Sequence, residues 1–250
     1  EFNYRAEGVA DGRDAVIRKT REVIKYGADV VKVAVTGGIL SKGTIPSAGQ
    51  YSDEELRAIV EEAHRLGRKV AAHAHGADGL RQAVRAGVDS IEHGSLIDEE
   101  GIALMKAKGA FLVADIYNGD FIDTYGREHD WPAGMIRKNR ETTDAQREGF
   151  RKAVKAGVKI AYGTDAGVYP HGWNARQMPY MVKYGMTPMQ AIQSATTVAA
   201  ELMGKTGKVG CDAAGCYADL IAVKGDPLSD ISTLTQVSKV MKGGAVLKDD

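Results

Sequence analysis

Cysteine is scarce in this 250-residue sequence, where only Cys211 and Cys216 occur. Two cysteines are too few for a disulfide framework, and a structural zinc site needs four ligands. We therefore expect two free thiols, with a local disulfide between them as the alternative. Because no targeting segment is visible, the cysteine count does not fix the cellular compartment, although a cytoplasmic location is slightly favoured.

Long apolar runs and blocks of like charge are also absent from the sequence. A membrane-spanning helix needs roughly 18 to 20 consecutive apolar residues, and no run approaches that length. The opening EFNYRAEGVADG lacks the apolar core of a signal peptide. Thirty-three basic residues balance thirty-three acidic ones without clustering, so the charge pattern of a nucleic-acid-binding protein is missing. The sequence therefore predicts a soluble protein with no membrane or nucleic-acid partner.

The composition is otherwise that of a globular protein, with 44% hydrophobic and 26% charged residues. From residue 14 to about residue 202, helical patterns alternate with short apolar runs, which indicates βα units around a parallel sheet. Runs rich in Val, Ile or Ala with few polar positions are typical of strands buried on both faces. The five predicted strands are 29–35, 69–73, 89–92, 110–114 and 158–162.

The predicted helices have recognisable ends. Ser52 precedes three acidic residues and is a predicted N-cap, and Gly67 is a predicted C-terminal stop. Glycine recurs between helix and strand at Gly27, Gly87 and Gly157, where a left-handed conformation costs glycine little. This repetition favours one continuous α/β architecture.

The pattern changes after residue 204, where helical periodicity stops and glycine-rich turns separate short strands. These predicted strands are 217–223, 238–241 and 245–248. So few antiparallel strands are not stable alone, and we expect them to pack on the α/β part or to complete a sheet. The sequence thus divides into a predicted α/β portion, 1–204, and C-terminal β-strands, 205–250.

Polar residues lie at the ends of the predicted strands, where barrel enzymes carry their catalytic groups. His73 and His75 are two residues apart and share a strand face, His93 ends the next strand, and Asp165 follows the last one. A single histidine on an apolar strand is more often a packed core residue. Three at neighbouring strand ends beside an aspartate form a donor set for a divalent metal. We therefore predict a metal site.

Lys32 interrupts a run of valines in the first predicted strand. With helices around it, that strand should be dry on both faces, and an uncompensated ammonium there is costly. One explanation is a lysine that reaches solvent at the strand edge or pairs with an acid. The nearby histidines favour another, in which Lys32 belongs to the metal site.

Several segments resemble the amidohydrolase superfamily, in particular its branch of Xaa-Pro dipeptidases, arginine carboxypeptidases and ochratoxin-hydrolysing enzymes. The resemblance covers nearly the whole chain and rests on KVAVTGG, IEHGSLID, GTDAGVYPHGWN, MTPMQAIQSATTVAAELMG and ADLIAVKGDPLSDI. The spacing also matches, with 41 residues from Lys32 to His73 and 20 from His73 to His93. The resemblance implies a (β/α)8 barrel of the TIM type, incomplete here with about five βα units, and C-terminal strands that belong to a small β-sandwich.

The resemblance also implies the chemistry of the site. Lys32 would be carboxylated and would bridge two divalent metal ions, usually zinc. His73 and His93 would ligate one ion, while Asp165 would ligate the other and move a proton. The reaction would be hydrolysis of an amide bond in a dipeptide or an N-acyl amino acid.

Four residues are predicted to contact the substrate. His75 matches the second histidine of the HAHG pattern in this branch, and a hydrogen bond to a metal ligand is its alternative role. His171 and Asn174 lie in PHGWN, which resembles the active-site loop of the family. Tyr117 belongs to the segment 115–131, a predicted long loop whose aromatic side chains suit a lid.

Members of the superfamily begin their barrel with an HxH motif, and no such motif precedes Asp14. We therefore expect this chain to need an N-terminal segment or a complementary chain, and a homo-oligomer is a further expectation. Three alternatives stay open. They are a cyclic-amide hydrolase of the imidazolonepropionase kind, a non-catalytic truncated barrel that acts as an assembly partner, and a phosphate-binding barrel, which the carboxylate in GTDAG disfavours.

Overall fold

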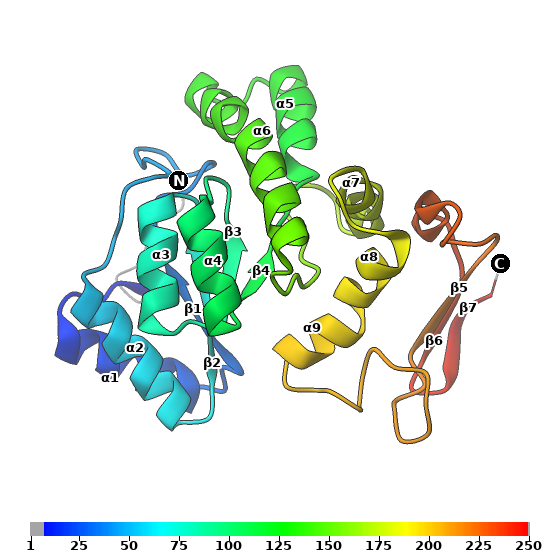
Figure 1. Cartoon of the computed structure of the whole chain (residues 1–250), viewed down its shortest axis with the longest axis horizontal. Helices are drawn as coiled ribbons and strands as arrows, with labels where there is room; N and C mark the ends of the chain where they lie inside the picture. The colour runs from blue at the N-terminus through cyan, green and yellow to red at the C-terminus, as the bar shows by residue number, and fades with distance from the viewer. Residues whose placement is uncertain (1–7, 250) are drawn as a thin grey trace.

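The computed structural model describes residues 8–249, which begin with a parallel sheet and its helices (Figure 1). The sheet has the order β1-β2-β3-β4, and each neighbouring pair is parallel. The carboxyl ends of the strands therefore meet at one edge. The predicted α/β class is confirmed. The elements are α1 (Arg13–Lys25), β1 (Val30–Ala34), α2 (Asp53–Arg65), β2 (Lys69–Ala74), α3 (Ala77–Ala86), β3 (Ser90–His93), α4 (Glu99–Lys108) and β4 (Phe111–Val113).

Ser52 caps α2 as predicted. Its hydroxyl accepts a hydrogen bond from the Glu55 N–H at 3.3 Å, and the Glu55 carboxylate accepts one from the Ser52 N–H at 2.8 Å. This reciprocal pair satisfies two donors that a helix start otherwise leaves without partners. Gly67 follows the helix with φ +69°, and the predicted glycine turns at Gly27, Gly87 and Gly157 are likewise left-handed.

The prediction of a fifth strand at 158–162 is wrong, because this segment does not form a regular strand. It makes one isolated parallel bridge, between Ile160 and Leu112, in which the Ala161 N–H donates to the Leu112 carbonyl at 3.0 Å. Because β4 is only three residues long, a longer ladder has no partner on which to continue. The segment nevertheless runs beside β4 and delivers Asp165 to the pocket at the strand ends.

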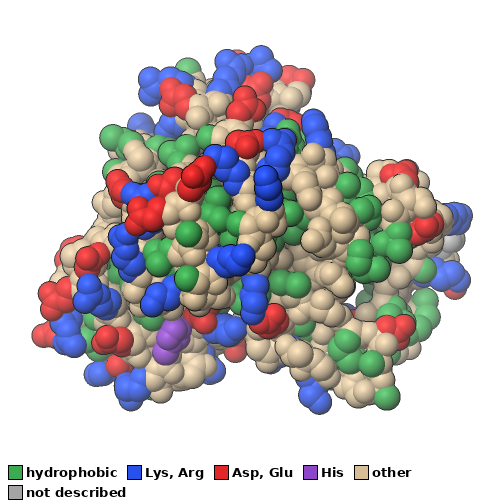
Figure 2. Space-filling model, in the orientation of Figure 1, with side chains coloured by type: hydrophobic (Ala, Val, Ile, Leu, Met, Phe, Trp, Pro, Cys, Tyr) green, Lys and Arg blue, Asp and Glu red, His purple; other side chains and the backbone are tan. Residues whose placement is uncertain are grey.

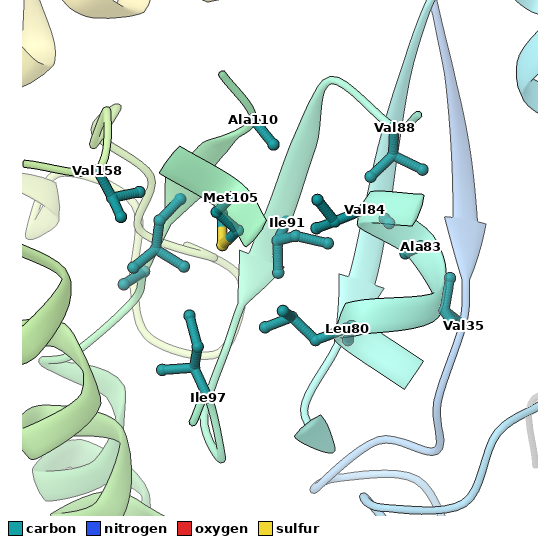
Figure 3. Packing of buried hydrophobic residues seen from close by; sticks show 14 of the residues in the cluster. Val35, Leu80, Ala83, Val84, Val88, Ile91, Ile97, Met105, Ala110 and Val158 are labelled. Atoms are coloured by element: carbon teal, nitrogen blue, oxygen red, sulfur yellow. The ribbon is translucent and has the colours of Figure 1, made fainter. Parts of the chain in front are cut away.

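The main core lies between the sheet and the helices that cover it. Leu80 and Val84 of α3 and Met105 of α4 lie around Ile91 of β3 (Figure 3). All four side chains are inaccessible to solvent. Burying a side chain of this size contributes about 1.5 to 3 kcal/mol. This packing fixes β3 and with it the position of His93 at the end of the strand.

The segment 115–131 is not the long loop that the sequence predicts, because it contains helix α5 (Asn118–Glu128). This helix packs against α6 (Ala133–Ala156), and Figure 1 shows the two as a pair beyond the strands. Glycine normally weakens a helix, but here it allows close approach. A Cβ on Gly119 would lie 2.5 Å from Thr143 Oγ1.

Three short helices connect the first part of the chain to a small antiparallel sheet (Figure 1). The sheet has the order β5-β6-β7, with both pairs antiparallel. It agrees with the three strands predicted after residue 204. The elements are the 3-10 segment η2 (Asn174–Arg176), α7 (Gln177–Lys183), α8 (Pro188–Ala195), α9 (Thr197–Leu202), β5 (Leu220–Val223), η3 (Ile231–Thr235), β6 (Val237–Lys242) and β7 (Ala245–Asp249).

The expectation of two free thiols is wrong, because Cys211 and Cys216 form a disulfide. A turn brings the two residues together: the Cys216 N–H donates to the Ala213 carbonyl at 3.1 Å, and the cysteine Cα atoms are 6.1 Å apart. The disulfide thus closes a short loop in the connection between α9 and β5.

Acidic and basic side chains are interspersed over the face shown in Figure 2. Many of them pair across the surface, as Arg85 Nη2 does with Glu100 Oε1 at 2.6 Å. Among residues 8–249, the structure has no helix that combines the length and the apolar character needed to cross a membrane.

Candidate metal centre and active site

A pocket of about 230 Å³ lies at the carboxyl ends of the parallel strands. Four predicted metal ligands line it: Lys32 from β1, His73 from β2, His93 from β3, and Asp165 from the segment that follows the bridge to β4. Because the strands are parallel, their carboxyl ends lie at the same edge of the sheet. This brings together Lys32 and Asp165, which are 133 positions apart in sequence. The opposite wall comes from α5 and α6.

His73, His75 and His93 form a compact group in this pocket. Each pair of ring centroids is 4.6 Å apart. One nitrogen from each ring lies within 4.8 Å of the others. The parallel register pairs Ala74 with His93, which sets the third ring beside the two rings that flank Ala74 in sequence.

Burial keeps two of these imidazoles neutral. Desolvation first, and then the charge of His93, lowers the pKa of His73 to about 4 and that of His75 to about 2. At pH 7 both rings therefore have a free lone pair. His75 is only 3% exposed, and its Nδ1 lies 2.8 Å from Ser95 Oγ. His75 is thus more deeply buried than we expect of a residue whose only role is to contact the substrate.

His93 differs from the other two because a carboxylate lies beside it. Its Nδ1 is 3.0 Å from Asp115 Oδ1. Burial lowers the pKa of His93, but the charge of Asp115 and the hydrogen bond to it outweigh burial and raise the pKa. Burial likewise raises the pKa of Asp115, and His93 outweighs it and holds that pKa below its ordinary range. Because Nδ1 of His93 faces Asp115, Nε2 is the nitrogen left for a metal.

Lys32 is exposed, which corrects the expectation that both faces of its strand are dry. Residues of β1 alternate, so that Val31 and Val33 pack in the core while Lys32 lies on the opposite, exposed face. That face borders the pocket. The dry strand that suggested a modified lysine is therefore absent on this face, and carboxylation of Lys32 stays a prediction that rests on the family resemblance.

Two predicted ligands share an unusual backbone conformation. His93 has φ +72° and Asp165 has φ +49°, and within residues 8–249 the other non-glycine residue with positive φ is Asp130. Such a conformation costs about 1 to 3 kcal/mol and persists only where the surrounding structure holds it. Strain of this kind clusters at functional sites, because it directs a side chain that an ordinary backbone would point elsewhere.

The donor set suits a divalent cation. His73, His75 and His93 form one group of donor atoms within 4.8 Å of one another, and His93, Asp115 and Asp165 form a second. Neutral imidazole nitrogens and carboxylate oxygens are the ligands that zinc and related ions take. His93 belongs to both groups, and with its Nδ1 against Asp115 it has one nitrogen to offer, so it can ligate one cation here.

The other predicted substrate residues do not line this pocket. His171 is exposed in the loop after the strand-like segment. Asn174 donates from Nδ2 to Thr164 Oγ1 at 3.0 Å, so it ties that loop to the segment that carries Asp165. Tyr117 is buried in a separate aromatic cluster, with its ring 5.1 Å from that of Tyr169. A contact between these residues and the substrate stays a prediction.

Asp115 is the site residue that sequence reasoning missed. It directly follows the predicted strand 110–114, and the strand-end position that identified His93 would also have found it. Gln146 donates from Nε2 to Asp115 Oδ1 at 2.9 Å and also lines the pocket. It lies within α6, where no sequence signal distinguishes it from other polar helix residues.

Known proteins resemble this chain over nearly its whole length. Residues 2–247 match the model of the Amidohydrolase family. The ochratoxinase of Aspergillus niger is 38% identical over 249 residues, which cover 96% of this chain and 50% of that protein. The chain therefore spans about half the length of the ochratoxinase it matches.

Solved structures show the same relationship. A crystal structure of a Xaa-Pro dipeptidase with methionine bound in its active site superposes with a TM-score of 0.93 and 42% identity, covering 99% of this chain and 62% of the dipeptidase. A prolidase complexed with N-methylphosphonate-L-proline gives a TM-score of 0.91 and 34% identity, covering 97% and 60%. With its strand-end histidines and aspartate in a (β/α)-barrel framework, the chain belongs to the amidohydrolase family.

Proposed function

We propose that the protein hydrolyses an amide bond in dipeptides or N-acyl amino acids and that it depends on a divalent metal ion. The similar proteins named dipeptidase, prolidase and ochratoxinase support this proposal. Because the chain spans about half of its curated relative, the activity is proposed for the whole protein. The observation that carries the proposal is the compact histidine group beside Asp165 at the strand ends.

In this proposal Lys32, carboxylated on Nζ, would hold two ions together with His73, His93 and Asp165, and zinc is the first candidate. Bound there, the ions would lower the pKa of a water molecule and would polarise the scissile carbonyl. Burial supports the role of His73, because it keeps the ring neutral and able to donate its lone pair. The pairing with Asp115 supports the role of His93, because it leaves Nε2 for the pocket.

Asp165 is the proposed proton carrier. Asp165 is exposed, but partial desolvation in the pocket, followed by the negative charge of Asp115, raises its pKa above the ordinary value. A carboxyl with a raised pKa exchanges protons more readily near neutral pH. Its position in the pocket would let it take a proton from the attacking water and pass it to the departing amine.

The pocket lining also includes apolar side chains, which suit a substrate with an apolar group. Ile39 and Leu40 come from the loop after β1, Ile122 from α5, and Val168 from the loop after Asp165. Ligand sites commonly combine apolar walls with a few placed polar groups. These apolar residues would contact the side chain or acyl group while the amide faces the histidines.

The test is metal analysis together with hydrolysis assays on the intact protein. We expect stoichiometric zinc and turnover of Xaa-Pro dipeptides or N-acyl amino acids. Asp165→Asn should lower kcat by at least about a hundredfold, the scale of lost general acid–base catalysis. Asp144→Asn, an exposed carboxylate on α6, is the matched control and should retain full activity.

The same experiment separates the alternatives. A protein that holds no metal and cleaves no amide would fit a non-catalytic barrel instead. Turnover confined to cyclic amides would assign the protein to the imidazolonepropionase kind. Near-normal turnover by Asp165→Asn would remove Asp165 from the chemistry.

A further inference from the structure

Asp115 is a buried carboxylate that three donors from three elements surround. Gln146 Nε2 of α6 donates to Oδ1 at 2.9 Å, Asn118 Nδ2 of α5 donates to Oδ2 at 2.7 Å, and His93 Nδ1 of β3 lies 3.0 Å from Oδ1. The residue is 9% exposed. A buried charge is costly unless it is paired and hydrogen-bonded, and these donors meet that condition. Their directions also fix the plane of the carboxylate.

A carboxylate offers about four lone-pair positions, so three donors leave little capacity for a metal ion. Gln146 contacts both Asp115 and His93, because its Nε2 also lies 3.4 Å from the His93 carbonyl. It thus strengthens the pairing of these two residues. Among the three clustered histidines, only His93 has a carboxylate as a hydrogen-bond partner. His75 meets the Ser95 hydroxyl, and His73 Nε2 lies 3.4 Å from the Gly37 carbonyl.

We propose that Asp115 is a positioning residue that holds the proton of His93 on Nδ1 and turns Nε2 toward the proposed metal position. The identity of the ligand bound there rests on the proposed function. The backbone of His93 is strained, with φ +72°. The contact with Asp115 holds the imidazole ring of this strained residue in one direction. Outer partners of this kind orient a ligating imidazole and make it more basic.

The first test reads the tautomer of His93 in metal-free intact protein labelled with ¹⁵N-histidine. The ¹⁵N NMR spectra are recorded at alkaline pH, where the imidazole ring of His93 is neutral and has one proton. We expect His93 with its proton on Nδ1. In Asp115→Asn the amide offers one acceptor oxygen to three donors, so the Nε2–H tautomer should appear. A wild-type His93 with its proton on Nε2 would overturn the proposal without any substitution, even if the variant does not fold.

The second test measures zinc affinity by competition with a chelator. Asp115→Asn should weaken zinc binding by about 10- to 100-fold, the usual effect of losing an outer-shell partner. Asp120→Asn is the matched control. It removes a nearby carboxylate that pairs with Arg147 at 2.7 Å instead of a histidine, and zinc affinity should stay unchanged.

The outcomes separate positioning from direct ligation. Loss of one zinc ion from Asp115→Asn with His93 still protonated on Nδ1 would make Asp115 a ligand and overturn the proposal. The proposal would also be overturned if wild type and Asp115→Asn had the same zinc affinity and the same tautomer of His93. If the wild-type protein binds no zinc, the proposed function fails, whereas the tautomer of His93 still decides the role of Asp115.

Discussion

Glu62 on α2 is a carboxylate enclosed by two guanidinium groups. Arg21 Nε of α1 donates to Oε1 at 2.6 Å, and Arg65 Nε donates to Oε2 at 3.0 Å. These hydrogen bonds, with that from Arg65 the strongest, lower the pKa of Glu62 from 4.5 to about 2. A carboxylate with a lowered pKa stabilises the fold above its unfolded pKa, and that contribution disappears as pH falls through the folded value.

Glu62→Gln should therefore lower the free energy of unfolding at pH 7 by about 1 kcal/mol, the scale of a net hydrogen bond. The difference from wild type should shrink as pH falls from 4.5 to about 2, because protonation removes the same charge from the native protein. Denaturant titrations at several pH values measure it. A difference that is constant from pH 7 to pH 2 would exclude the charge as its cause.

At the scale of elements, α6 holds the loop that borders the pocket. Lys138 Nζ donates to the carbonyls of Gly38 at 2.9 Å, Ser41 at 2.7 Å and Thr44 at 3.3 Å. An ammonium has three protons to donate, and the ammonium of Lys138 has three carbonyl acceptors. Gly38 and Ser41 both line the pocket, so one side chain of α6 fixes part of the pocket wall.

Lys138→Met should loosen this loop and raise KM by about five- to tenfold with a smaller change in kcat, because loss of three hydrogen bonds costs roughly 1 to 3 kcal/mol of loop order. Lys155→Met, an exposed lysine near the end of the same helix, is the control and should leave KM unchanged. Steady-state kinetics and limited proteolysis provide the measurements. Unchanged KM together with an unchanged cleavage pattern would show that the loop keeps its shape without Lys138.

At the scale of the molecule, the proposed metal centre joins β1, β2, β3 and the segment that carries Asp165. An ion bound only by the folded protein stabilises it by mass action, about 2.7 kcal/mol at a free concentration one hundred times Kd. Metal removal from the intact protein should therefore lower Tm, and added zinc should restore it. Magnesium is the control, because it prefers oxygen ligands. Equal Tm values for metal-free and zinc-loaded protein would contradict a centre built on these strand ends.

The sequence by itself determined the strand-end residues and the helix ends. Parallel βα repetition brings the carboxyl ends of strands to one edge, so Lys32, His73, His93 and Asp165 could be placed together from spacing and family resemblance. Ser52 was equally accessible, because its capping partner lies three residues away. Such features depend on near neighbours in sequence or on a regular repeat.

Only the tertiary structure decided the features that depend on contacts between distant segments. The hydrogen bond from Gln146 to Asp115 spans 31 residues and depends on where α6 crosses the strand ends. The segment around Gly119 is helical and approaches Thr143 closely, so its glycine is a packing residue rather than a loop signal. The exposure of Lys32 likewise depends on which face of β1 the helices cover. Local periodicity carries none of this information, because packing partners are chosen only when the elements meet.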